Sequence, residues 1–175
     1  VSGVTVDIDG ETRLNPPDIG ADEFNLVAND AGVSAMVAPI PPCPGINTVS
    51  VKVKNYGTTS LTSVTIGWSV NGVTQSPFTT TILPLSQFQE TTLNVGNYSF
   101  SIGTNYNLKY WTTQPNGVTD GNSINDTFLY KNLSAAFGGT YTIGGASASY
   151  PTIAAAIVDM QAKGICGPTT FKINK

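Results

Sequence analysis

Oxygen-bearing side chains gather in one short stretch in the second half of the chain. Asp120, Asn122, Asn125 and Asp126 place two carboxylates and two amides within seven residues. Ca²⁺ binds about six to eight oxygens in proteins, and a turn can add main-chain carbonyls to such a set. The spacing differs from an EF-hand loop, however, and Asp and Asn are common in turns because they hydrogen-bond to their own backbone. We therefore expect a turn with no bound cofactor, and a calcium site at these four residues is the alternative.

A second group of carboxylates lies near the start of the sequence. Its members are Asp7, Asp9, Glu11, Asp18, Asp22 and Glu23. Two carboxylates hydrolyse a glycosidic bond only when a cleft holds them across the sugar with separated pKa values. Nothing in the surrounding sequence predicts such a cleft, and the chain contains no histidine, which is the commonest general base. We therefore expect solvated turn residues or a cap on a structural unit here, no catalytic residues and no enzyme activity.

Aromatic residues suggest a third kind of site, one that stacks against a sugar. Tyr106, Leu108 and Tyr110 alternate with polar residues, so they share one face of a strand, and Trp111 lies on the other face. An exposed flat ring can cover the C–H face of a sugar, which makes Trp111 the candidate ligand-binding residue. The alternative is that Trp111 covers a domain junction or a sheet edge. Trp68 continues a row of apolar residues, and we expect it in the core.

The composition excludes two classes of function. Charged residues make up only 11% of the chain, and the net charge is −3. Nucleic-acid binding needs clustered cations, which this sequence lacks. No apolar run reaches the roughly 18 residues of a membrane span. The low charge suits an exported, extracellular protein, and because no cationic segment with an apolar run opens the sequence, we expect any export signal to lie outside it.

The two cysteines are Cys43 and Cys166. They are too few for a disulfide framework and are not spaced as zinc ligands. A bridge between them would need their Cα atoms within about 7 Å, which a sequence cannot establish. We therefore expect two unpaired thiols, and a single long-range disulfide is the alternative.

The centre of the chain has the pattern of short strands separated by turns. Valines occupy every second position of residues 49–53, which places them on one face of a strand, and a second row follows at 64–70. The Asn-Gly pair at 71–72 supplies the positive φ that a tight hairpin requires. About seven such strands indicate an all-β fold, an immunoglobulin-like antiparallel β-sandwich over residues 25–131.

The two flanks of the sandwich are expected to be pieces of neighbouring domains. Residues 1–24 combine one short strand with an acidic, turn-rich tail. Residues 132–175 begin as a glycine-rich linker, and a helix follows that Pro151 opens and Gly164 ends. Each flank has too few strands and helices to bury its own apolar faces. The expected flanking strands are Val4–Ile8, Thr140–Ile143 and Thr169–Ile173.

Two motifs in the centre carry a family resemblance. They are Val-Ser-Val-Lys-Val-Lys-Asn-Tyr-Gly at 49–57 and Val-Thr-Ile-Gly-Trp-Ser-Val-Asn-Gly at 64–72. With the Asp- and Asn-rich stretch at 120–132, segment 33–131 resembles the CARDB family of cell-adhesion-related, immunoglobulin-like modules from bacterial surface and secreted proteins. The resemblance implies an immunoglobulin-like fold and a non-catalytic role.

The flanks resemble another family. Asp7-Ile-Asp-Gly-Glu-Thr-Arg and the stretch 17–24 are similar to the closing segment of right-handed parallel β-helix domains of the pectate-lyase-like class. The stretches 149–157 and 167–173 are similar to the opening of such a domain, where an amphipathic helix caps the first coil. Together the resemblances imply an immunoglobulin-like module between two β-helices, in a modular surface protein similar to those of Bacteroidetes-type bacteria.

These inferences predict a non-catalytic spacer and adhesion module of a large, exported bacterial cell-surface protein. The expected partners are neighbouring domains of the same chain and, beyond them, other surface proteins or polysaccharide. The alternative is a carbohydrate-binding accessory module of a polysaccharide-degrading surface system, with the sugar on Trp111. An enzyme of the β-helix class is set aside, because too few residues lie outside the sandwich to build its groove.

Overall fold

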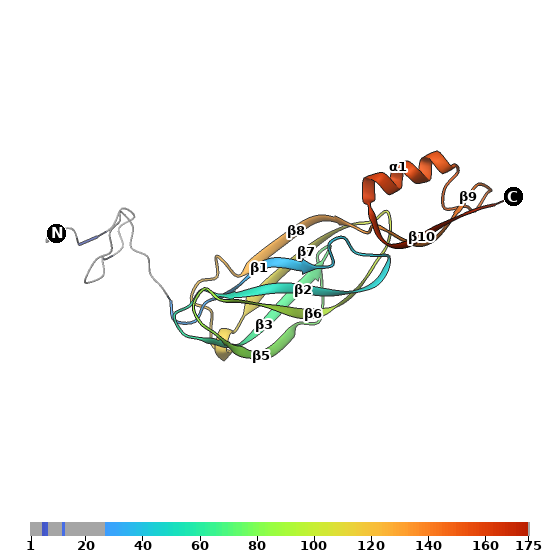
Figure 1. Ribbon diagram of the computed structural model, residues 1–175. Coiled ribbons are helices and arrows are strands. Elements are labelled where there is room, and N and C mark those ends of the chain that lie inside the picture. The colour runs from blue at the N-terminus through green and yellow to red at the C-terminus, as the bar shows by residue number, and fades with distance from the viewer. Residues whose placement is uncertain (1–4, 7–11, 13–26, 175) are drawn as a thin grey trace.

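Two antiparallel sheets face each other across an apolar core (Figure 1). The computed structural model describes residues 5–6, 12 and 27–174. One sheet has the strand order β1-β2-β6, and the other has the order β4-β3-β7-β8 with β5 also paired to β3. The strands are β1 (Ala31–Ala38), β2 (Gly45–Asn55), β3 (Leu61–Val70), β4 (Val73–Thr74), β5 (Phe78–Leu85), β6 (Glu90–Phe100), β7 (Asn105–Thr113) and β8 (Thr127–Ser134). The predicted all-β, immunoglobulin-like antiparallel sandwich is confirmed.

The period of two in β2 has the predicted effect on burial. Val49, Val51 and Val53 are fully buried, whereas Lys52 between them faces solvent. Strand β2 lies between β1 and β6 in its sheet, and the three valines belong to the core between the two sheets. A shift of register by one residue would turn the valine row to water, so the apolar pattern fixes the pairing.

The hairpin between β3 and β4 depends on its Asn-Gly pair. Asn71 and Gly72 have φ values of 48° and 81°. Positive φ at both central residues gives the turn the twist of the strands that it joins. The main-chain N–H of Asn71 then donates to the carbonyl of Asn107, and this bond ties the hairpin to β7.

Aromatic side chains fill one part of the core. Trp68 is 3% exposed, and its indole Nε1 donates to the carbonyl oxygen of Ser76 at 3.0 Å. Tyr98 meets the rings of Trp68, Phe100 and Tyr106 edge to face, the geometry that aromatic quadrupoles favour. Burial of one such side chain stabilises the fold by about 1.5–3 kcal/mol. The predicted core position of Trp68 is confirmed.

The sandwich has two ends with different connections. The loops 27–30, 56–60 and 114–126 meet at one end, which we call the acidic end. Its turn at 56–57 rests on Asn55, whose side chain donates to the carbonyls of Thr59 at 3.0 Å and Leu85 at 2.8 Å. The Asn55 Oδ1 atom also accepts from the N–H of Gly57. The short 3-10 turn η1 (Pro115–Gly117) lies in the third loop.

The opposite end of the sandwich carries a small β-α-β unit (Figure 1). It consists of β9 (Phe137–Ile143), α1 (Ile153–Lys163) and β10 (Ile165–Ile173), and we call it the C-terminal unit. The strands β9 and β10 pair in parallel, and the helix forms the crossover between them. Thr152 caps α1 by accepting a hydrogen bond from the N–H of Ala155, and Gly164 ends the helix with φ of 75°.

The elements of the C-terminal half run further than the sequence pattern predicts. Strand β8 continues through Ser134, beyond residue 131, because Leu133 is buried in the sandwich core. Strand β9 begins at Phe137 rather than Thr140, and Phe137 is fully buried. Strand β10 begins at Ile165 rather than Thr169. The glycine-rich stretch that we expected to be a linker therefore holds paired strand.

A disulfide joins the C-terminal unit to the sandwich. Cys43, in the connection between β1 and β2, is bonded to Cys166 at the start of β10, with the two Cα atoms 5.4 Å apart. The expectation of two unpaired thiols is wrong, because the fold brings together residues that are 123 positions apart. In the chain-entropy account, such a bridge constrains the unfolded chain and thereby stabilises the folded state, typically by about 2–4 kcal/mol. Gly138 leaves room for the bridge, since a Cβ there would lie 3.0 Å from the Cys166 sulfur.

Candidate functional site

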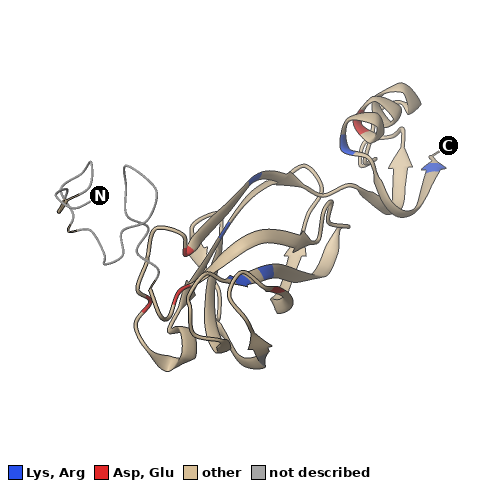
Figure 2. Cartoon of the chain, turned by 60° about the vertical axis from the view of Figure 1, so that its left-hand side comes forward, with Lys and Arg blue, Asp and Glu red and all other residues tan. Residues whose placement is uncertain are grey.

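Four oxygen-bearing side chains meet at the acidic end of the sandwich. Asp30 directly precedes β1, Asp126 directly precedes β8, and the others lie in the β7–β8 connection. Figure 2 shows acidic positions at this end of the sandwich. We call Asp30, Asp120, Asn125 and Asp126 the oxygen cluster. The sequence predicted all of its members except Asp30, which is 95 positions from Asn125 but accepts a hydrogen bond from it.

Part of this region forms the turn that the sequence predicts. Asp120 Oδ1 accepts from the N–H of Asn122 at 2.9 Å, and Asn122 Oδ1 accepts from the N–H of Ile124 at 3.3 Å. Such bonds to the local backbone are typical of Asx turns. Asp120 also reaches out of its own loop, because its Oδ2 accepts from the N–H of Ala31 at 3.0 Å. The turn thereby fastens the β7–β8 connection to the start of β1.

The turn leaves several oxygens without a donor. Asp30 is only 5% exposed, and its Oδ2 accepts from the side-chain amides of Asn125 at 3.2 Å and Asn122 at 3.5 Å. Its Oδ1 is buried and has no hydrogen-bond partner, and the same holds for Asn125 Oδ1 and Asp126 Oδ1. A buried charged oxygen without a partner destabilises the folded state. The local turn therefore explains Asp120 and Asn122 but does not explain the other three side chains.

Burial and neighbouring negative charges raise the pKa of two carboxylates of the cluster, Asp126 and Asp30. Burial, with the charges of Asp120 and Asp30, raises the pKa of Asp126 to about 6, against a smaller opposing effect of a hydrogen bond from Thr112. Burial likewise raises the pKa of Asp30, which the hydrogen bond from Asn125 opposes and the charge of Asp120 reinforces. Like charges and a low-dielectric environment both disfavour the ionised form.

Cations are absent from this cluster, in contrast to the other carboxylates in the described part of the chain. Glu90 pairs with Lys52 at 3.3 Å and Asp159 with Lys163 at 2.6 Å. Within the described ranges, no Lys or Arg forms an ion pair with any of the three carboxylates of the oxygen cluster. The described residues therefore leave the negative charge at the acidic end without an ion-pair partner.

The oxygen cluster is not a preformed metal centre. Among residues 5–6, 12 and 27–174, no three His, Cys, Asp or Glu side chains are already arranged to hold a metal ion. A cation here would also need the amide oxygen of Asn125, main-chain carbonyls or water. The main-chain carbonyl of Asn125 faces the start of β1, because it lies 2.6 Å from where a Cβ of Gly32 would be.

Trp111 lies on the outer face of the β3-β7-β8 sheet. Leu108, Tyr106 and Tyr110 are buried on the inner face, as their alternation predicts, and Trp111 is half-buried on the opposite side. Its indole covers Gly67 on β3, where a Cβ would collide with the ring. The Lys109 ammonium lies 5.6 Å from the centre of the Trp111 ring. Trp111 as a sugar-binding residue stays a prediction.

The acidic tract of the N-terminal flank lies outside the described residues. This holds for all six of its carboxylates and for the segment 17–24. Of the expected first strand, the structure describes only Thr5 and Val6, and Val6 forms an isolated antiparallel bridge with Thr12. The predicted cap or turn role of this tract therefore stays a prediction.

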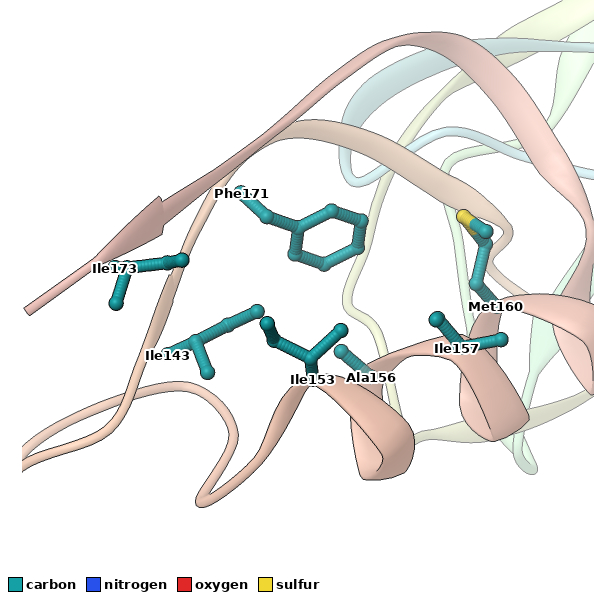
Figure 3. A pocket seen from close by; sticks show the side chains of 7 residues that line it. All are labelled: Ile143, Ile153, Ala156, Ile157, Met160, Phe171 and Ile173. Atoms are coloured by element: carbon teal, nitrogen blue, oxygen red, sulfur yellow. The ribbon is translucent and has the colours of Figure 1, made fainter.

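The C-terminal unit presents an apolar cleft (Figure 3). The cleft measures about 240 Å³, and aliphatic side chains from α1, β9 and β10 point into it together with Phe171. Its lining residues are Ile143, Ile153, Ala156, Ile157, Met160, Phe171 and Ile173. Ile153 remains 51% exposed and Ile173 68% exposed, so the apolar face of this unit is only partly covered.

Two solved structures resemble this chain over its sandwich. A domain of a Methanosarcina acetivorans protein that is provisionally named a cell surface protein matches with a TM-score of 0.52 and 21% identity, covering 64% of this chain and 96% of that one. A CARDB domain from Pyrococcus furiosus, solved in complex with di-metal ions, matches with a TM-score of 0.50 and 19% identity, covering 66% and 100%. The likeness shows that the sandwich has the fold of CARDB domains.

Comparisons of the amino-acid sequence find no related family and no related curated protein. No protein-family model matches the chain. No curated protein matches it either. Among the described residues, no helix is long and apolar enough to cross a membrane.

Proposed function

We propose that this chain is a non-catalytic, immunoglobulin-like spacer and adhesion module of an exported cell-surface protein. The observation that carries the proposal is the CARDB-like sandwich, whose structural neighbours include a domain provisionally named as part of a cell surface protein. The disulfide between Cys43 and Cys166 supports export, because disulfides persist in oxidising compartments and are rare in the cytosol. The bacterial origin implied by the sequence resemblance stays a prediction.

Surface exposure of the parent protein tests this proposal. An antibody raised against the purified chain is expected to label intact cells of the organism that encodes it. A membrane-impermeant biotin reagent is expected to modify Lys52 and Lys131, which are exposed on the sandwich. Labelling that appears only after the cells are permeabilised would contradict a surface location.

The spacer role requires that the C-terminal unit keeps a fixed place on the sandwich. Two links support this: the disulfide, and the hydrogen bond from the N–H of Ala136 to the carbonyl of Pro42 at 2.9 Å. Small-angle X-ray scattering of the oxidised chain is expected to fit one rigid arrangement of these parts. Scattering that requires a C-terminal unit moving freely would contradict the spacer role.

We also propose that the C-terminal unit is the first coil of a β-helix-like domain. The parallel pairing of β9 with β10 across a helix, and the partly exposed isoleucines of the cleft, support this interpretation. In a parallel β-helix, the next coil would extend the sheet and cover these side chains. The coding sequence of the parent protein is a direct test, because recurring strand-length apolar segments are expected after Lys175. A following region without such repeats would contradict the β-helix.

A carbohydrate-binding accessory module is the second candidate, and the outward position of Trp111 favours it. Gly67 leaves room for the indole to lie against the outer face of the sheet, where the ring is half-exposed. A glycan-array screen of the parent chain and Trp111→Ala tests the idea, with Leu129→Ala as the matched control. Leu129 is 53% exposed and pairs with Lys109 on the same outer face. Binding that Trp111→Ala leaves unchanged would contradict a role for the ring.

A further inference from the structure

We propose that the oxygen cluster at the acidic end binds one Ca²⁺ ion. The proposal is independent of the surface role above. It stands on Asp30, a carboxylate that is nine-tenths buried and has an oxygen without any partner. The side chain of Asp30 is directed into the cluster, because its other oxygen accepts from Asn122 and Asn125. A carboxylate buried this deeply requires a donor or a cation on its free oxygen.

Two further oxygens point to the same ligand. Asn125 Oδ1 and Asp126 Oδ1 are also buried and unpartnered. Together with the carboxylate of Asp120, the cluster offers oxygen donors from four side chains and three formal negative charges. A buried water molecule would donate to an oxygen but would leave these charges uncompensated. A divalent cation satisfies the free oxygens and neutralises most of the charge.

The donor set selects calcium among divalent cations. All of the side-chain donors are oxygens, which hard cations prefer over the softer transition metals. Mg²⁺ demands a near-ideal octahedron, whereas Ca²⁺ accepts flexible geometry with more ligands, including main-chain carbonyls and water. The carboxylates are not closed around one point before binding. Extracellular modules with such open sites bind Ca²⁺ with dissociation constants of about 10⁻⁴–10⁻³ M.

The ion would join segments that are distant in sequence. Asp30 belongs to the segment that enters β1, and Asp126 belongs to the segment that enters β8. In the protein alone, these segments are linked through Asp120, which accepts from Ala31, and through the amides of Asn122 and Asn125. A shared cation would fix the β7–β8 connection to the start of the sandwich and stiffen this end.

Thermal unfolding of the full chain tests the proposal. In 10 mM CaCl₂ the Tm is expected to rise by about 3–10 °C over its value in EDTA, as a ligand of this affinity implies. MgCl₂ at the same concentration is expected to raise it less. Tb³⁺ should replace Ca²⁺ and luminesce when tyrosine is excited, because the ring of Tyr56 and the main-chain carbonyl of Asn125 both lie beside Gly32.

Two variants locate the site. Asp120→Asn and Asp126→Asn are each expected to abolish most of the Ca²⁺-dependent rise in Tm, and CaCl₂ is expected to displace Tb³⁺ from the parent chain only. Asp159→Asn is the matched control, because it removes a carboxylate outside the cluster and should retain the full rise. Tyr56→Phe should reduce the Tb³⁺ luminescence and keep the rise in Tm. Circular dichroism confirms that each variant is folded.

Three results would overturn the inference. A Tm that CaCl₂ leaves unchanged in the parent chain excludes the site. An equal rise in Asp126→Asn and the parent would place the binding elsewhere, for example on the acidic tract at residues 7–23. An equal or larger rise with MgCl₂ would refute the choice of calcium.

Discussion

The two ends of the sandwich are closed by different chemistry. At the acidic end, loops meet through Asp and Asn side chains, and three carboxylates lie together without an ion pair to any Lys or Arg of the described part of the chain. At the opposite end, a covalent bond between Cys43 and Cys166 and an apolar β-α-β unit hold the chain. The only carboxylate described in that unit, Asp159, is paired with Lys163.

This difference shows what each end requires from its surroundings. The disulfide end requires an oxidising compartment, in which the bond persists. The acidic end, if it binds calcium as we propose, requires a divalent cation at about the millimolar concentrations that weak extracellular sites need. Both requirements are met outside a cell. Between the two ends, the core of buried valines and aromatic rings requires neither.

The largest expected effect concerns the core that lies between the two ends. Leu108 is fully buried between the sheets, and Leu108→Ala is expected to reduce the free energy of unfolding by about 2–5 kcal/mol. Urea denaturation followed by tryptophan fluorescence measures this loss. Leu129→Ala, on the exposed outer face, is the control and should change stability by less than about 0.5 kcal/mol. Similar losses in both variants would contradict the two-layer core.

Removal of the disulfide is expected to separate the C-terminal unit from the sandwich. In the double variant Cys43→Ala, Cys166→Ala, the free energy of unfolding should fall by about 2–4 kcal/mol, because the unfolded chain is no longer constrained. Hydrogen exchange should accelerate in β9, α1 and β10, whereas β2 and β3 remain protected. Exchange that accelerates equally in the sandwich would show that the bridge stabilises the whole fold and not one end of it.

Local patterns explain why the sandwich could be predicted from the sequence. The valines of β2 and the row that contains Trp68 each place apolar residues at every second position, and strand geometry converts this directly into one buried face. The helix α1 likewise follows from apolar residues at steps of three and four, and it ends at Gly164 as predicted, although Thr152 and not Pro151 is the residue that caps its start. These signals depend on neighbours within about ten residues, so the rest of the chain does not alter them.

Long-range proximity explains what the sequence could not predict. Asp30 joins the oxygen cluster only because β1 and β8 begin at the same end of the sandwich. The same is true of the disulfide, whose cysteines are brought together by the connection after β1 and by the late strand β10. No sequence spacing indicates that Asp30 meets the oxygen cluster or that Cys43 meets Cys166. Asp120 and Asp126 could be found because they are neighbours in the sequence.

Loss of the Asn55 side chain is expected to weaken the acidic end without affecting the disulfide end. The Asn55 side chain, which is 1% exposed, forms hydrogen bonds with main-chain groups of Thr59, Leu85 and Gly57, so Asn55→Ala removes three hydrogen bonds. The expected loss is about 1–3 kcal/mol, measured by urea denaturation. Asn97→Ala is the matched control, because its bond to Thr48 is exposed to solvent. Hydrogen exchange faster in β10 than at residues 56–60 would contradict a local effect.

The smallest expected effect contrasts a paired carboxylate with the unpaired ones. Hydrogen bonds from Lys163 and then Tyr150 hold the pKa of Asp159 below its usual value. A lowered folded-state pKa stabilises the fold at pH values above that of the unfolded chain, about 3.9, and the stabilisation is lost as the pH falls through the folded-state value.

Asp159→Asn should therefore lower the free energy of unfolding, relative to the parent chain, by about 0.5 kcal/mol at pH 7 and by less at pH 3. In EDTA, Asp126→Asn should do the opposite and raise the Tm at pH 7, because it removes a buried charge that has no cation. Differential scanning fluorimetry of the two variants beside the parent chain measures both signs. If both substitutions lowered the Tm, the carboxylates at the two ends would be equally well paired, and the contrast between the ends would be wrong.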